Sequence, residues 1–166
     1  MSAAEKLESP ISEEFLNSFF DATQKVFQTQ GNVKVQLVET TPFPMGMPNS
    51  SPTAIAGVIQ ISCNTFNGSL ALGFPKETFL KFYENLLGEA CTEISVEMQD
   101  AASEFLNMIY GTAKTHLNQK GHNLALAIPT VFQGANLQIR FQKDKPSIFA
   151  EYKSDIGPFY LFFSGE

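Results

Sequence analysis

Residues 100–134 read DAASEFLNMIYGTAKTHLNQKGHNLALAIPTVFQG, and the first half of this stretch has the spacing of an amphipathic helix. At about 100° per residue, one side of the helix collects the apolar residues Ala101, Ala102, Phe105, Met108, Ile109 and Ala113. The other side collects Asp100, Ser103, Glu104, Asn107, Gly111 and Lys114. We therefore predict that the longest helix of the chain, residues 96–118, lies on a core and exposes this polar side.

Two further helices and seven strands are expected around that helix. Ser12 can cap a helix that ends near Gly31, and Pro75 can begin one that ends at Gly88. Apolar segments bounded by turn residues predict strands at residues 33–38, 54–63, 69–74, 124–132, 137–141, 148–152 and 159–163. Residues 67–68 are Asn-Gly, which favours a hairpin turn after the second strand. The prediction is an α+β fold with three helices packed on a largely antiparallel sheet.

The tetrapeptide Glu-Phe-Leu-Asn occurs twice, at residues 14–17 and 104–107. Both copies fall on predicted helices that are followed by predicted strands. Four matching residues are weak evidence by themselves, but the matching context strengthens them. We therefore expect an internal duplication of a helix-plus-strands unit.

Length and composition fit a single domain. The chain has 166 residues, of which 43% are hydrophobic, so residues 1–166 can form one core without metal or disulfide support. Residues 42–53, PFPMGMPNSSPT, contain four prolines and no periodicity, which predicts a loop. Its Met45 and Met47 either contact a partner or belong to a solvated insertion, and the second interpretation is favoured.

The net charge and the remaining residue types argue against several classes of protein and kinds of site. A net charge of −6 argues against binding to nucleic acid or to anionic membranes, because both depend on clustered Lys and Arg. No signal peptide and no apolar run of about 20 residues is visible, so a cytoplasmic protein without membrane insertion is expected. Cys63 and Cys91 are interpreted as thiols, and His116 and His122 lack metal-ligand spacing, so no metal site is expected.

Glu104 and Asn107 are three residues apart and are therefore neighbours on the exposed side of their helix. Asp100 lies one turn before Glu104. Gly111 lies one turn after Asn107, and its missing side chain would let another surface approach closely. Alone, such a pair is typical of any solvated helix face and says almost nothing about function.

The wider stretch is far more specific, because it resembles the core signature of the CheC/CheX/FliY phosphatases. That family carries an acidic or Ser residue, a Glu four residues later, an Asn three after that, and a Pro downstream. The corresponding residues are Asp100, Glu104, Asn107 and Pro129, with the last spacing one residue shorter than the common pattern. The runs GTAKT and IPTVFQG also look like the family. The segment EFLNSFFDATQKVF is similar to the first helix of CheX-type proteins, so the CheX branch fits best.

The resemblance implies a phosphatase that acts on the aspartyl phosphate of a CheY-like response-regulator receiver. The receiver would supply Mg²⁺ and a lysine, so this chain needs no cofactor of its own. Asn107 would position the attacking water, since an amide both donates and accepts hydrogen bonds, and Glu104 would pair with the receiver lysine. Asp100, Gly111 and Pro129 would support docking. CheX proteins are homodimers, so the resemblance favours a homodimer.

The first copy, Glu14 and Asn17, is a candidate for a degenerate second site. The position that should hold an acidic or Ser residue is Pro10, and the nearest downstream proline, Pro42, comes two residues late. Glu14 alternatively serves only the N-terminus of its helix.

Other interpretations remain open. A non-catalytic adaptor of the same fold would bind a receiver without hydrolysing its phosphate, although the retained Glu104 and Asn107 argue against it. A structural component like the related motor-switch proteins is a second alternative. An unrelated enzyme is a third, without support from a Gly-rich phosphate loop or a GxSxG motif. The sequence identifies neither the receiver nor its pathway, whether chemotaxis or another two-component circuit. The last strand, residues 159–163, is expected at an edge of the sheet.

Overall fold

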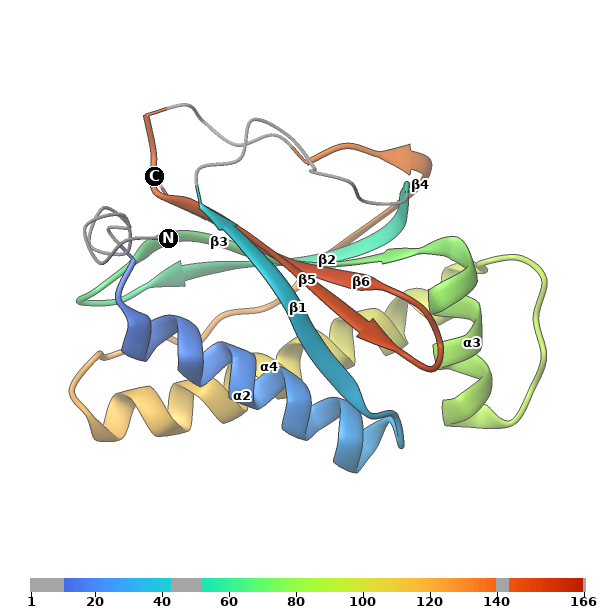
Figure 1. The fold of residues 1–166 in the computed structure, drawn as a ribbon, viewed down its shortest axis with the longest axis horizontal. Helices are drawn as coiled ribbons and strands as arrows, with labels where there is room; N and C mark the ends of the chain where they lie inside the picture. Colours follow the sequence, from blue (N-terminus) through green and yellow to red (C-terminus); the bar gives the residue numbers. More distant parts are fainter. Residues whose placement is uncertain (1–10, 43–51, 140–143, 166) are drawn as a thin grey trace.

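The computed structural model describes residues 11–42, 52–139 and 144–165, which form three α-helices and one six-stranded sheet (Figure 1). The helices are α2 (Glu13–Gln30), α3 (Lys76–Leu87) and α4 (Gln99–Gln119), with a 3-10 helix η1 (Val96–Met98) directly before α4. The strands are β1 (Val35–Pro42), β2 (Thr53–Ser62), β3 (Asn67–Pro75), β4 (Thr130–Leu137), β5 (Ser147–Ser154) and β6 (Phe159–Gly165). Every neighbouring pair of strands is antiparallel, which confirms the predicted fold class.

The strand order, β1-β5-β6-β3-β2-β4, interleaves two units that follow one another along the chain. The first unit is α2-β1-β2-β3 and the second is α4-β4-β5-β6, and each unit places its first strand at the far edge of the sheet, beyond two strands of the other unit. The counterparts are β1 and β4, β2 and β5, and β3 and β6. Exchanging each strand for its counterpart gives β4-β2-β3-β6-β5-β1, which is the same order read from the other edge of the sheet. The topology therefore agrees with the predicted duplication, and α3 is an addition between the two units.

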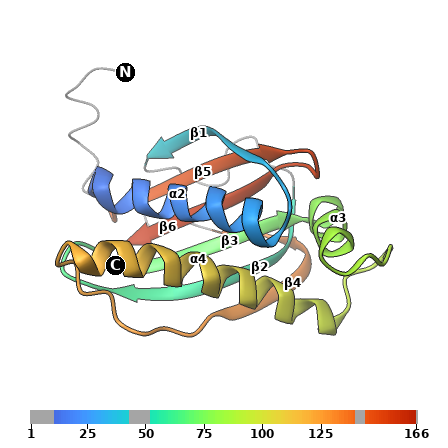
Figure 2. The same cartoon turned by 90° about the horizontal axis from the view of Figure 1, so that it is seen from below.

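Helices α2 and α4 lie side by side on one face of the sheet, and α3 covers one end (Figure 2). An aromatic cluster joins all three helices to the strands. Phe27 of α2 stacks on Phe159 of β6 with ring centroids 4.4 Å apart, and Phe82 of α3 meets Phe105 of α4 at 4.5 Å. Phe27 and Phe105 are themselves in edge contact at 5.2 Å. This packing fixes α4 at Phe105, the residue next to Glu104.

The helix ends follow the sequence signals. The Ser12 side chain accepts a hydrogen bond of 3.0 Å from the backbone N–H of Phe15, and α2 ends at Gly31. Helix α3 ends at Gly88, whose φ of 74° is the left-handed conformation that favours glycine.

Two of the predicted strands merge into one. Instead of separate strands at residues 124–132 and 137–141, β4 runs from Thr130 to Leu137, and residues 140–141 lie outside the described part of the chain. Pro129 has no backbone N–H to donate, so regular pairing with β2 begins only after it. Pro42 belongs to β1 rather than to the expected loop, and residues 43–51 of that loop lie outside the described residues.

The expected edge position of the last strand is wrong. β6 lies between β5 and β3, and the outer strands are β1 and β4. Phe159, Leu161 and Phe163 face the helices, whereas Tyr160 and Phe162 belong to a second cluster with Phe149. A strand that is buried on both faces carries a continuous apolar run, and such a run does not reveal its neighbours.

The expected Asn-Gly turn is also absent. Asn67 and Gly68 are already paired within β3, with Ser62 and Ile61 as partners. Gly68 is required for a different reason: a Cβ at this position would lie 2.2 Å from the carbonyl oxygen of Ser164 in β6. Gly68 is therefore explained by the close approach of β3 and β6 and not by a turn.

Candidate functional site

The polar side of α4 faces away from the sheet and is exposed along several turns. Asp100, Glu104, Asn107 and Gly111 are all exposed. The opposite side is buried, through Ala102, Phe105, Leu106, Ile109, Tyr110, Ala113 and Leu117. The four candidate residues on α4 thus form one surface, which we call the α4 face.

The backbone beneath this face is held rigidly. Phe105 and Leu106, the two residues between Glu104 and Asn107, are 3% and 0% exposed. Their side chains lie in the core, so the helix cannot rotate without exposing them. The carboxylate and the amide are therefore presented to solvent from a fixed position.

Neither Glu104 nor Asn107 has a hydrogen bond or ion pair to any of the described residues. An exposed side chain without an internal partner remains available to another molecule. A carboxylate can pair with a cation, and the neighbouring amide can hold a water by donating and accepting.

A depression of about 430 Å³ lies between α4 and α2, and its lining includes Gly111 of the α4 face. Gly111 and Met108 line it from α4, and Lys25 and Val26 line it from α2. A Cβ built on Gly111 would meet no atom within 4 Å. The glycine is therefore not needed for packing within the chain.

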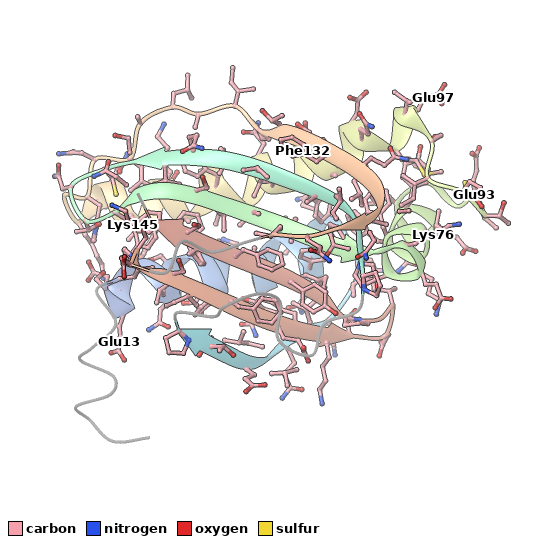
Figure 3. The ribbon with its side chains drawn as sticks, turned by 90° about the horizontal axis from the view of Figure 1, so that it is seen from above. Glu13, Lys76, Glu93, Glu97, Phe132 and Lys145 are labelled. Carbon is pink, nitrogen blue, oxygen red and sulfur yellow. The ribbon has the colours of Figure 1, made fainter. Side chains whose placement is uncertain are left out.

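The start of α4 is tied to β4 by glutamines that the sequence reasoning missed. The Gln99 side-chain amide donates to the Gln133 side-chain oxygen at 2.9 Å, and the Gln133 amide donates to the carbonyl of Ile94 at 2.8 Å. Figure 3 shows this end of the molecule, where Lys76, Glu93 and Glu97 are labelled. No local motif marks the glutamines, because they are 34 residues apart.

Pro129 lies at the end of a segment without regular secondary structure, residues 122–129, that returns from α4 to the sheet. Tyr110 connects the segment to α4, since its hydroxyl donates to the carbonyl of Ala125 at 2.5 Å. Burial raises the pKa of the Tyr110 hydroxyl above its usual range. This contact fixes the segment at Ala125, four residues before Pro129, and the role of Pro129 stays a prediction.

The first copy of the motif has a different environment. Asn17 is exposed, but the Glu14 carboxylate accepts from His122 Nε2 at 2.6 Å and pairs with Lys120 Nζ at 3.3 Å. The hydrogen bond from His122, followed by that from Lys120, holds the pKa of Glu14 below its usual range. Pro10 lies outside the described residues. Sequence reasoning did not connect these three side chains.

Other kinds of site have little support in the described residues. Within residues 11–42, 52–139 and 144–165, no three His, Cys, Asp or Glu residues are grouped so that they could hold a metal ion. In the same ranges, no helix is long and apolar enough to cross a membrane. Cys63 and Cys91 are free thiols.

Solved structures of similar fold cover almost the whole chain. A CheC-like superfamily protein from Shewanella sp. PV-4 matches with 27% identity and a TM-score of 0.84, over 93% of this chain and 99% of that one. The chemotaxis protein CheX from Vibrio vulnificus matches with 24% identity and a TM-score of 0.80, over 92% and 99%. The CheX–CheY–BeF₃–Mg²⁺ complex from Borrelia burgdorferi matches with 19% identity and a TM-score of 0.69, over 93% and 97%.

No curated protein gives a significant match by sequence. The sequence model of the family described as chemotaxis phosphatase CheX matches residues 55–153, which is more than half of the chain. The matched region contains Glu104, Asn107 and Pro129, whereas Glu14 and Asn17 precede it. This chain therefore belongs to the CheX family.

Proposed function

We propose that this chain hydrolyses the aspartyl phosphate of a phosphorylated, CheY-like receiver domain. The receiver docks on the α4 face, and its active-site lysine pairs with Glu104. Asn107 then holds one water in line with the phosphorus. Asp100 and Gly111 border the same contact, and Pro129 supports the segment beside α4.

In this reaction the main task of the chain is to position the receiver and one water molecule. The oxygen of water attacks phosphorus, and the bond from phosphorus to the aspartyl oxygen breaks. The products are inorganic phosphate and the free aspartate of the receiver. Because the transition state is loose, catalysis depends mainly on placing the water and neutralising charge. Neither Glu104 nor Asn107 gives up or takes a proton in this scheme.

One observation carries the proposal: Glu104 and Asn107 are exposed on a rigid helix and have no partner among the described residues. Membership of the CheX family supports it. The relative from Borrelia burgdorferi forms a complex with CheY, BeF₃ and Mg²⁺, in which BeF₃ stands in for the phosphoryl group. That composition supports a receiver that brings its own Mg²⁺, so we propose no cofactor held by this chain.

The direct test is a hydrolysis assay. Receiver domains from the same cell are phosphorylated with a small phosphodonor, and release of inorganic phosphate is followed with and without this chain. We expect faster release with at least one receiver. A non-catalytic adaptor would bind a phosphorylated receiver without accelerating release, and absence of both effects with every receiver would exclude the proposal.

Glu104→Ala is expected to weaken docking. Loss of a charge-assisted contact should raise the Kd for a receiver activated with BeF₃⁻ and Mg²⁺ about tenfold. Isothermal titration calorimetry measures this change. Glu97→Ala is the matched control, because Glu97 is also an exposed carboxylate and lies in η1, just before α4. Equal affinities for wild type and Glu104→Ala would show that this carboxylate does not contact the receiver.

A further inference from the structure

The chain contains the Glu-x-x-Asn pair twice, and the two copies differ in their contacts with the described residues. Glu104 has no ion pair with the described residues, whereas both carboxylate oxygens of Glu14 are engaged. One oxygen meets His122 at 2.6 Å and the other meets Lys120 at 3.3 Å. Both partners belong to the turn that follows α4.

His122 is fixed in the position that faces Glu14. Its side chain is 7% exposed, and its Nδ1 lies 2.7 Å from the hydroxyl of Thr65 in the turn between β2 and β3. Its backbone N–H donates to the carbonyl of Leu117, and its carbonyl accepts from the N–H of Asn64. Because Thr65 holds the ring at Nδ1, the Nε2–H on the other side of the ring is directed at the Glu14 carboxylate. Breaking that hydrogen bond would leave a buried donor without a partner.

A second difference lies one turn beyond each Asn. Gly111 is seven residues after Glu104, and the corresponding residue seven after Glu14 is Asp21. Gly111 leaves open space, whereas Asp21 presents an exposed carboxylate. A receiver carrying a phosphoryl group would meet both a side chain and a like charge at Asp21.

We infer that the first copy is closed by the chain itself, with Lys120 and His122 taking at Glu14 the place that the receiver lysine takes at Glu104. This inference rests on the proposed function. Each chain then binds one receiver rather than two. Glu14 then acts as an anchor that joins the start of α2 to the turn after α4 and, through His122 and its contact with Thr65, to the β2–β3 turn.

Binding stoichiometry tests the closed copy. Calorimetric titration with a BeF₃⁻–Mg²⁺-activated receiver should give one receiver per chain. Asn17→Ala should leave both the stoichiometry and the hydrolysis rate unchanged. Two receivers per chain, or a rate loss in Asn17→Ala as large as that in Asn107→Ala, would overturn the inference.

Thermal unfolding tests the anchor without any receiver. At about pH 7, Glu14→Gln should lower Tm by a few degrees, because the buried ring of His122 loses its ionic acceptor. Glu13→Gln is the matched control, since it removes the same charge from the same helix turn at an exposed position. Equal Tm values for the two variants would refute the anchor. Absence of receiver binding would refute the proposed function. The Tm values of Glu14→Gln and Glu13→Gln would still test the anchor, because they are measured without a receiver.

The anchor should also depend on pH. Among the described residues, His122 and Lys120 are the groups that face Glu14, and their hydrogen bonds lower its pKa in the folded chain. A lowered folded pKa adds stability above the ordinary Glu value, and this stability is lost as the pH falls through the folded pKa. The Tm difference between wild type and Glu14→Gln should therefore shrink between about pH 7 and about pH 3. A difference that stays constant over this range would contradict the ionic contact.

Discussion

Asn107→Ala is expected to lower the rate of phosphate release from a bound receiver about 100-fold, because the attacking water loses the amide that positions it. Alanine cannot donate or accept a hydrogen bond through its side chain, so the water is free to leave the line of attack. Glu104 and the rest of the α4 face are unchanged. The loss should therefore appear in kcat, while KM and the Kd for the activated receiver stay close to wild type.

The first copy provides a control for this measurement. Asn17→Ala makes the same change at an exposed position on α2 and should retain the wild-type rate. Asn107 is exposed and has no described hydrogen bond, so Asn107→Ala should also retain the wild-type Tm. A normal rate in Asn107→Ala would remove the water-positioning role. A fall in Tm similar to that of a core substitution would show instead that the residue is structural.

The sequence was sufficient to predict the architecture of the α4 face. Helical spacing alone separates Phe105 and Ile109 from Glu104 and Asn107, and burial in the structure divides them in the same way. The repeated tetrapeptide predicted a duplication, and the strand order has the corresponding symmetry. The first prediction depends on helical periodicity and the second on a repeated tetrapeptide, and a single sequence records both directly.

The sequence could not predict that Glu14 of the α2 pair is engaged within the chain while the Glu-x-x-Asn pair of α4 has no partner among the described residues. The tetrapeptides at residues 14–17 and 104–107 are identical, so their composition cannot distinguish them. Glu14 is engaged by residues 106 and 108 positions away in the chain. Such contacts depend on how α2 and α4 are placed on the sheet. For the same reason, the apolar run of β6 predicted a strand correctly but not its central position.

Gly111→Met is expected to make the chain more stable and at the same time less active. Glycine in the middle of an exposed helix costs roughly 0.8 to 1 kcal/mol relative to good helix formers such as methionine. A Cβ at position 111 meets no atom within 4 Å, so no steric penalty offsets this gain. Thermal unfolding should show a Tm about 2 to 4 °C above wild type.

Activity should change in the opposite direction. If the receiver closes on the α4 face, a methionine one turn from Asn107 separates the two surfaces at the point where the water must be held. A displacement of about 1 Å can cost about 100-fold in rate, so kcat/KM should fall by about that factor. Phosphate release at low receiver concentration measures this quantity.

The equivalent position of the first copy gives the matched control. Asp21→Met introduces the same side chain at the same place on α2, and the closed copy predicts no loss of activity. Full activity in Gly111→Met would mean that the receiver does not approach this part of α4. Equal losses in Gly111→Met and Asp21→Met would mean that both helices contact receivers. A loss confined to Gly111→Met, in a chain that is more stable than wild type, has no explanation in folding. It would identify the gap left by the glycine as the place where the partner must come close.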